Sequence, residues 1–405
     1  MEAFIFQPAD ILLPADAGIN MTRWSVIACD QFTSDRLYWE QAEALVGSAP
    51  STLRLMLPEY YLGKCDEAAA TAQIQETMRA YLDQGLFQTY AHSFIYLERT
   101  LPNGCTRRGL IGQVDLEAYD YASDSVSPVR ATEGTVESRL PARVHVRRKA
   151  SLEMPHIMLF FNDKSDSVMQ KAHELAGETV YDFDLMLGGG HVLGRCISNA
   201  EADALADYIA GLNREEPLQF AVGDGNHSLA AARKLWMEKR ELLDEERRVH
   251  DPARFALVEL VNIHDPAITF EPIHRVLLHT DASHFMEAAR SALEDPNAAH
   301  VITLLSAGTQ CRIPVHGASI GAVIDSVEAF CRNYVSVYGG EIDYIHGDQE
   351  TIDLASDHDA AGVLLPLMDK EALFASVAKT GPFPKKSFSI GLGPDKRYYL
   401  ECRKL

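Results

Sequence analysis

The segment from Phe220 to Trp236, FAVGDGNHSLAAARKLW, joins an apolar run to an alanine-rich run through a short polar turn. The apolar run predicts a buried strand, and the alanine-rich run predicts a helix that begins near Ser228. A helix N-terminus presents backbone N–H groups without intrahelical partners and carries a partial positive charge, so it readily binds an anion. The sequence therefore predicts a strand–turn–helix unit whose turn is suited to an anionic ligand.

The turn itself consists of Asp224, Gly225, Asn226 and His227. Gly225 lets the backbone approach a ligand closely, Asp224 can order the loop or hold a metal ion, and His227 can donate to a phosphate oxygen or move a proton. An alternative is that these residues only cap the helix and satisfy their own backbone. Capping explains one polar residue better than three together, so we favour a binding turn.

Composition limits the classes of function. A chain of 405 residues is long enough for two or more domains, and its hydrophobic (47%) and charged (23%) contents are those of a globular protein. A net charge of −21 argues against nucleic-acid binding, which needs a basic surface. The seven cysteines form no Cys-x-x-Cys pair, so neither a disulfide framework nor a structural zinc site follows. Without a signal-peptide pattern or an apolar run of membrane-spanning length, we expect a cytoplasmic protein without membrane contacts.

Strand-like and helix-like runs of mixed order predict an α/β fold of the mixed α+β type. No linker divides the chain, but a boundary near 280 is plausible, separating residues 1–280, which carry the turn, from a lobe at 281–405. The run LPNG between two strand-like runs, 93–100 and 108–115, predicts a hairpin.

Two further polar patterns have both a functional and a structural interpretation. Residues 188–191 are typical of a hairpin turn. The upstream Asp182 and Asp184 could share a metal ion or form a solvated strand face, and we favour the solvated face. Five cations gather within eleven residues and either bind an anion or form local ion pairs on a helix face. They are Arg139, Arg143, Arg147, Arg148 and Lys149.

Six separated segments together resemble the bacterial and archaeal family known as domain of unknown function 1015, and they follow the family's order. They are residues 26–34, 130–140, 220–236, 271–276, 342–347 and 384–387. The resemblance covers essentially the whole chain, but the family name carries no function.

Residues 220–236 also resemble the nucleotide-binding segment of the ParB/sulfiredoxin superfamily, which includes a chromosome-partitioning CTPase, sulfiredoxin and free serine kinases. The resemblance implies a ParB/sulfiredoxin-like nucleotide-binding core with additional α/β lobes. Many members of the first family carry Asp-Gly-His-His-Arg where this chain has Asp224-Gly225-Asn226-His227-Ser228. The missing Arg removes an always-charged phosphate donor, which puts catalysis in doubt more than binding.

These observations favour a phosphotransferase that uses a nucleoside phosphate and Mg²⁺ to phosphorylate a small hydroxylated metabolite, such as a free hydroxy amino acid. Catalytic roles are expected for Glu133 as base, Asp224 as carboxylate for Mg²⁺ or the acceptor, and His227. The remaining expected phosphate-binding residues are Gly225, Asn226, Arg130, His274, Arg275 and Lys386.

Convergence of residues 130–139, 224–227 and 274–275 on one pocket would support this assignment. The alternatives are a nucleotide-binding switch without turnover and, disfavoured by the acidic charge, a ParB-like DNA-associated factor. The acceptor, the nucleotide base and the oligomeric state do not follow from the sequence.

Overall fold

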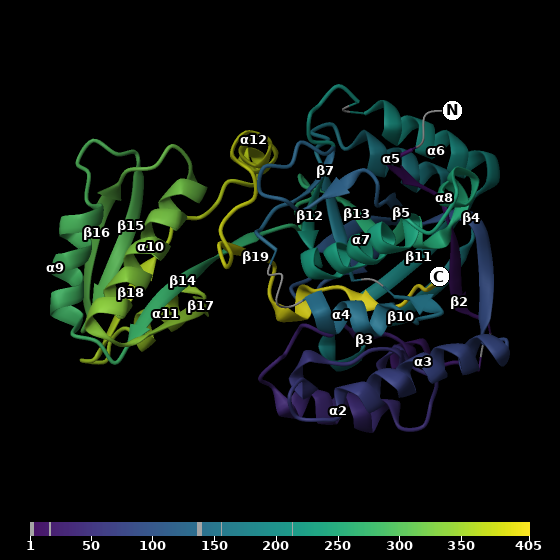
Figure 1. Cartoon of the computed structure of the whole chain (residues 1–405), viewed down its shortest axis with the longest axis horizontal. Coiled ribbons are helices and arrows are strands. Elements are labelled where there is room, and N and C mark those ends of the chain that lie inside the picture. The colour runs from purple at the N-terminus through teal and green to yellow at the C-terminus, as the bar shows by residue number, and fades with distance from the viewer. Residues whose placement is uncertain (1–3, 16–17, 136–139, 155, 213) are drawn as a thin grey trace. The chain divides into compact units, whose positions relative to one another are not determined.

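The chain folds into two compact units, which the computed structural model describes over residues 4–15, 18–135, 140–154, 156–212 and 214–405 (Figure 1). Unit 1 comprises residues 1–268 together with 392–405, and unit 2 is the intervening stretch 269–391. The expected mixed α/β fold is confirmed. The boundary expected near 280 falls inside unit 2, and the C-terminal residues return to unit 1 instead of completing a second lobe.

A mixed sheet of eleven strands forms the centre of unit 1. In spatial order its main path is β10 (Thr179–Asp184), β11 (His191–Ser198), β4 (Phe87–Thr100), β5 (Thr106–Asp115), β13 (Phe255–Asn262), β9 (Met158–Phe161), β12 (Phe220–Asp224), β7 (Val129–Ala131) and β6 (Tyr119–Asp120), with β1 (Phe6–Gln7) beside β5 and β2 (Ala9–Pro14) beside β4. Strands β4 and β5 are the predicted hairpin. Most neighbours are antiparallel, but β12 runs parallel to β7, so the carboxyl ends of these two strands lie at the same edge.

Helices cover both faces of this sheet. They are α1 (Met21–Trp24), α2 (Arg36–Val46), α3 (Glu67–Asp83), α4 (Leu140–Arg147), α5 (Ser167–Leu175), α6 (Asn199–Gly211), α7 (Asn226–Arg240) and α8 (Glu245–His250), with 3-10 turns η1 (Thr52–Leu55), η2 (Glu59–Tyr61), η4 (Met186–Gly188), η5 (Pro252–Arg254) and η7 (Gly393–Asp395). Successive strand residues point to opposite faces, and Phe94 and Ile95 accordingly belong to two different buried clusters. Ile95 packs in the cluster that contains Trp39 of α2, and Phe94 in the cluster that contains Trp236 of α7.

The C-terminal residues are tied into unit 1 by two short strand pairs. Strand β20 (Tyr398–Tyr399) pairs with β3 (Val26–Ile27), and β21 (Arg403–Lys404) pairs with β8 (Leu152–Glu153). Buried ion pairs strengthen this attachment, since the Arg397 guanidinium lies 2.7 Å from the carboxylate of Glu259 and also contacts that of Glu401.

Unit 2 is an antiparallel sheet with helices. Its strands are β16 (Thr309–Val315), β15 (His300–Ser306), β18 (Ala360–Leu364), β14 (Phe270–Leu278) and β17 (Glu341–His346) in spatial order, with β19 (Phe388–Ile390) also beside β14; its helices are α9 (Ala282–Leu293), α10 (Ile320–Tyr338), α11 (Asp348–Leu354) and α12 (Leu373–Thr380), with η6 (Lys370–Ala372). Phe285 of α9 and Val323 of α10 pack against Leu304 of β15 and Val363 of β18, so unit 2 has a hydrophobic core of its own.

None of the helices in the described ranges combines the length and the apolar character that crossing a membrane requires.

Candidate functional site

The expected strand–turn–helix unit is present at residues 220–240. Strand β12 ends at Asp224, and α7 begins at Asn226, two residues before the start expected from the sequence. Gly225 adopts φ +77° and ψ 22°, a left-handed conformation that favours glycine. A Cβ atom at this position would lie 2.9 Å from the Cα atom of Ile157, so the turn is also too crowded for a side chain.

The start of α7 retains the features of an anion-binding helix terminus. The N-cap residue of the helix is Gly225, which has no side chain that could accept a hydrogen bond from the first N–H groups. The Asn226 amide oxygen at this point is buried and has no hydrogen-bond partner in the described part of the chain. An unsatisfied buried polar atom is costly, and a ligand that bonds to it would relieve that cost.

Asp224 is held by two partners. One carboxylate oxygen accepts a hydrogen bond from the Gly225 backbone N–H (2.9 Å), and the other lies 3.2 Å from the Lys396 ammonium. The sequence interpretation missed Lys396, because the residue lies far along the chain and reaches the turn only through the returning C-terminal segment. That segment is fixed by Arg99, whose guanidinium donates to the carbonyls of Gly189 (3.0 Å), Pro394 (2.7 Å) and Lys396.

Strand β7 brings one predicted site residue toward the turn and directs another away. Ala131 is paired in parallel with Val222, and the Thr132 hydroxyl donates to the Val222 carbonyl (2.7 Å), so Glu133 follows at the edge where Asp224 ends β12. Arg130 is also on β7, but its guanidinium donates to the carbonyls of Ser125 (3.1 Å) and Pro217 (2.8 Å). Pro217 precedes β12, so the Arg130 guanidinium is held near the start of that strand and not at the turn.

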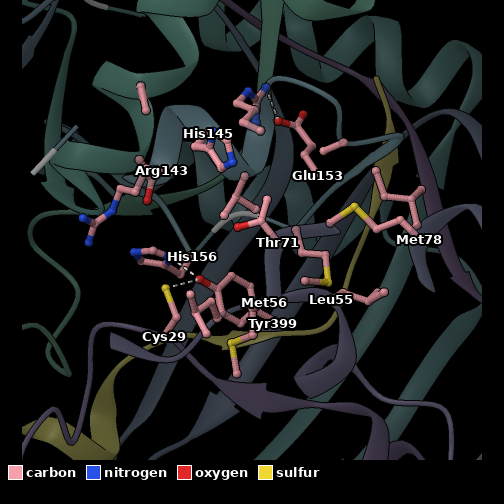
Figure 2. Close-up of a pocket in the computed structure, with 18 of the residues that line it drawn as sticks. Cys29, Leu55, Met56, Thr71, Met78, Arg143, His145, Glu153, His156 and Tyr399 are labelled. Atoms are coloured by element: carbon pink, nitrogen blue, oxygen red, sulfur yellow. Dashed lines mark hydrogen bonds and ion pairs between the residues drawn. The ribbon is translucent and has the colours of Figure 1, made fainter. Parts of the chain in front are cut away.

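A cavity of about 390 Å³ opens beside the first turns of α7 (Figure 2). Of the segment 220–236, Ser228 and Ala231 line it, whereas the turn residues 224–227 are not among its lining residues. Most of the lining is apolar. These side chains are Leu55, Met56, Leu57, Leu62, Met78, Val146, Leu152, Met154 and Ile157. The volume lies within the range of small-molecule sites.

A chain of polar side chains closes one end of the cavity, as Figure 2 shows. His156 Nε2 forms an ion pair with Asp30 (3.2 Å), His156 Nδ1 lies 2.8 Å from the Tyr399 hydroxyl, and that hydroxyl donates to the sulfur of Cys29 (3.1 Å). Burial alone would lower the pKa of His156, but the Asp30 carboxylate outweighs it and the pKa lies above its ordinary value, with Asp224 adding to the effect. The cavity end is therefore electrostatically linked to the turn.

The thiol in this chain of contacts is not a nucleophile at neutral pH. Burial, with the Asp30 charge adding to it, raises the pKa of Cys29 to about 12. For Asp30 burial acts against ionisation, yet His156 and Arg143 hold the carboxyl pKa far below its usual range. The sequence interpretation assigned no role to His156 or Tyr399. Asp30 and Cys29 lie within one of the family-like segments, which was the available signal.

The cationic run before β8 forms local ion pairs. Arg143 pairs with Glu59, Arg147 lies 2.6 Å from the Glu153 carboxylate, and Arg148 lies 2.7 Å from that of Glu238. Arg139 lies outside the described residues. The structural interpretation of this cluster, ion pairs on a helix face, therefore fits the described part of it.

Three predicted phosphate-binding residues belong to unit 2 and have contacts there. His274 Nε2 lies 2.8 Å from the Asp348 carboxylate, and its Nδ1 accepts from the Leu365 N–H (3.0 Å). Arg275 is fully buried, pairs with Glu328 (3.0 Å) and donates to the Lys386 carbonyl (2.9 Å). Their convergence with the turn stays a prediction, because they lie in the other unit.

Gly188 to His191 form the predicted hairpin turn between β10 and β11. His191 lies between the two aspartates, 2.7 Å from the carboxylate of Asp182 and 2.8 Å from that of Asp184, and these hydrogen bonds raise its pKa. Across the described residues no group of three or more His, Cys, Asp or Glu side chains is arranged to hold a metal ion.

Comparison with known proteins gives a family match and distant structural similarities. The family model described as "Protein of unknown function (DUF1015)" matches residues 12–337. Among curated proteins no sequence matches. Solved structures with partial similarity include SbnI with a C-terminal truncation from Staphylococcus aureus, which has a TM-score of 0.39 and 11% identity over 70% of this chain and 82% of that one. A free serine kinase in complex with AMP has a TM-score of 0.40 and 11% identity over 71% of this chain and 90% of that one. A conserved hypothetical protein from Pyrococcus furiosus has a TM-score of 0.37 and 12% identity over 71% of this chain and 94% of that one. Similarity this distant does not define a ligand.

Proposed function

The chain belongs to the DUF1015 family of proteins of unknown function, and we propose that it is a nucleotide-dependent phosphotransferase for a small hydroxylated compound. The observation that carries this proposal is the start of α7, where the N-cap is a crowded left-handed glycine beside the Asp224–Lys396 pair. Such a helix start offers backbone N–H groups and a partial positive charge to a phosphate.

Phosphate binding at this helix start would use groups already in place. The first N–H groups of α7 and the His227 side chain would donate to phosphate oxygens, and the Lys396 ammonium would neutralise part of their charge. Asp224 fits a role toward Mg²⁺, because this ion is usually held by one or two carboxylates and by the phosphates of the substrate. Bound Mg²⁺ would neutralise charge on the transferred phosphoryl group.

Glu133 is the proposed base for the acceptor hydroxyl. The parallel register of β7 and β12 supports this, since Asp224 ends β12 and Glu133 follows β7 at the same edge of the sheet. A general base must lie within hydrogen-bond reach of the proton that it accepts, and a carboxylate at this edge would be beside the transferred phosphoryl group.

The first test is nucleotide binding. Thermal stability would be measured with ATP, CTP and ADP in the presence of Mg²⁺, and then for His227→Ala, which should weaken binding roughly tenfold to a hundredfold by removing a donor to the phosphates. His250→Ala, at the exposed end of α8, is the matched control and should bind as the wild type does. If no nucleotide stabilises the protein at millimolar concentration, the proposal fails.

A nucleotide-binding switch is the second candidate. Ser228 occupies the place of an Arg in related motifs, so one strong phosphate donor is missing from the turn. Nucleotide binding without any phosphorylated product would favour the switch over the phosphotransferase.

A further inference from the structure

The lining of the 390 Å³ cavity restricts what can occupy it. Aliphatic and thioether side chains form most of its surface, and two pairs of the charged groups in the lining are already neutralised: Arg143 with Glu59, and Arg147 with Glu153. A charged ligand body placed among these apolar side chains would lose hydration, and the two ion pairs offer it no unpaired charge in return. An apolar body would be favoured by its removal from water.

The polar end of the cavity can receive one hydroxyl group. The Tyr399 hydroxyl donates to the Cys29 sulfur, and sulfur is a weak hydrogen-bond acceptor. A ligand oxygen that enters beside Cys29 would be a stronger acceptor for the same O–H. His156 Nδ1 lies 2.8 Å from the Tyr399 oxygen (Figure 2), and the Asp30 carboxylate raises the pKa of His156, which favours the ring form that donates to this oxygen and strengthens Tyr399 as a donor.

Ser228 connects the cavity to the proposed phosphate site. It lines the cavity and belongs to the first turn of α7, directly after the turn residues. Ile157 is a second connection, because it lines the cavity directly after His156 and its Cα atom would lie 2.9 Å from a Cβ atom at Gly225. A hydroxyl bound at Tyr399 would therefore lie on the side of the cavity that faces the start of α7.

We propose that the acceptor is an alcohol with an apolar body, which the cavity encloses, while Tyr399 binds its hydroxyl; this inference rests on the proposed phosphotransferase function. In the reaction the alcohol oxygen forms a bond to the terminal phosphorus of the nucleotide. The bond from that phosphorus to the bridging oxygen breaks, its electron pair leaves with the nucleotide product, and the hydroxyl proton passes to Glu133. Free hydroxy amino acids, whose charged groups would be desolvated in this cavity, are poor acceptors by the same reasoning.

The substitution Ala68→Trp tests this inference. Ala68 lines the cavity from the first turn of α3 but is exposed, so an indole there narrows the cavity without disturbing the core. Ala69→Trp is the matched control, because Ala69 is the next residue of the same helix, is also exposed, and is not among the residues that line the cavity. Binding of 3-phenylpropanol, benzyl alcohol and 1-hexanol would be measured by saturation-transfer NMR, beside serine, threonine and glycerol.

The wild type and Ala69→Trp should bind the apolar alcohols, whereas Ala68→Trp should weaken their binding and raise their KM at least about tenfold, with little change in nucleotide affinity. Tyr399→Phe should retain alcohol binding in part and lose turnover. Phosphorylated product would be followed by ³¹P NMR.

The inference would be overturned if the protein bound serine but no apolar alcohol, or if both Trp variants bound the alcohols equally well. Loss of nucleotide binding in Ala68→Trp would also overturn it, because the cavity would then hold the nucleoside. Failure of the proposed function is distinguishable, because alcohols would then bind to a protein that binds no nucleotide.

Discussion

Replacement of Gly225 by alanine should damage both the fold and the proposed phosphate site. At φ +77° an L-residue is strained by about 1–2 kcal/mol, and the new Cβ would lie 2.9 Å from Ile157 Cα and 3.0 Å from Ile157 Cγ1. Ile157 is 2% exposed and cannot move away freely, so overpacking adds about 1–3 kcal/mol. The expected loss in the free energy of unfolding is about 2–5 kcal/mol.

Gly85 supplies the matched control. It has φ +66°, lies exposed between α3 and β4, and a Cβ there would meet no atom within 4 Å. Gly85→Ala should therefore show the backbone strain alone, about 1–2 kcal/mol. Urea unfolding followed by tryptophan fluorescence measures both variants in unit 1, because Trp24, Trp39 and Trp236 all lie there and are fully buried.

The two variants should also differ in nucleotide binding. Gly225→Ala displaces the first N–H groups of α7 from their positions and should weaken nucleotide binding at least about tenfold, whereas Gly85→Ala should not. Equal stability losses in the two variants would show that the contact with Ile157 is absent. Unchanged nucleotide affinity in Gly225→Ala would refute the assignment of phosphate binding to this helix start.

Three further predictions concern single side chains. Glu133→Gln should leave nucleotide affinity within about twofold and reduce turnover about a hundredfold, as expected for loss of a general base; a kcat within about threefold of the wild type would exclude that role. His156→Gln breaks the pair with Asp30. Because the pKa of Asp30 is lowered in the folded state, the pair stabilises the fold above about pH 4; because the pKa of His156 is raised, this stabilisation is complete below about pH 6.5. The difference in the free energy of unfolding between the variant and the wild type should therefore be largest between these two pH values. A difference that does not change with pH would contradict the pairing. Arg275→Met removes the buried partner of Glu328, which keeps Arg332 and the Tyr344 hydroxyl, and should destabilise unit 2 by about 1–3 kcal/mol. The loss should be seen by circular dichroism but not by tryptophan fluorescence, and nucleotide affinity should be unchanged; a lower affinity would support a role of Arg275 in phosphate binding.

The turn at Asp224 could be predicted because its signal is local. Gly225, the apolar run before it and the alanine-rich run after it specify a strand, a left-handed residue and a helix within seventeen residues. Arg130 shows the limit of such reasoning. Its strand β7 lies beside β12, but the direction of its guanidinium depends on the carbonyls of Ser125 and Pro217, which no sequence spacing encodes.

Lys396 and Tyr399 could not be found from the sequence for a related reason. They reach the site through the pairing of β20 with β3, which joins residues nearly the whole chain apart. The boundary at 280 was displaced because unit 2 is inserted into unit 1, and an insertion joined by ordinary strand and loop residues leaves no compositional mark. Non-local strand pairing and insertion are both properties of the folded chain and not of any window of it.

The return of residues 392–405 to unit 1 affects how the protein is made. A ribosome releases the chain from its N-terminus, so the sheet of unit 1 is complete in sequence long before Lys396 and Tyr399 emerge. A chain whose synthesis stops within unit 2 would contain Glu259 but lack its partner Arg397. Loss of one partner of a buried carboxylate strongly destabilises the fold. Prematurely terminated chains would therefore be poorly folded as well as inactive, and quality-control proteases could remove them before they bind a ligand.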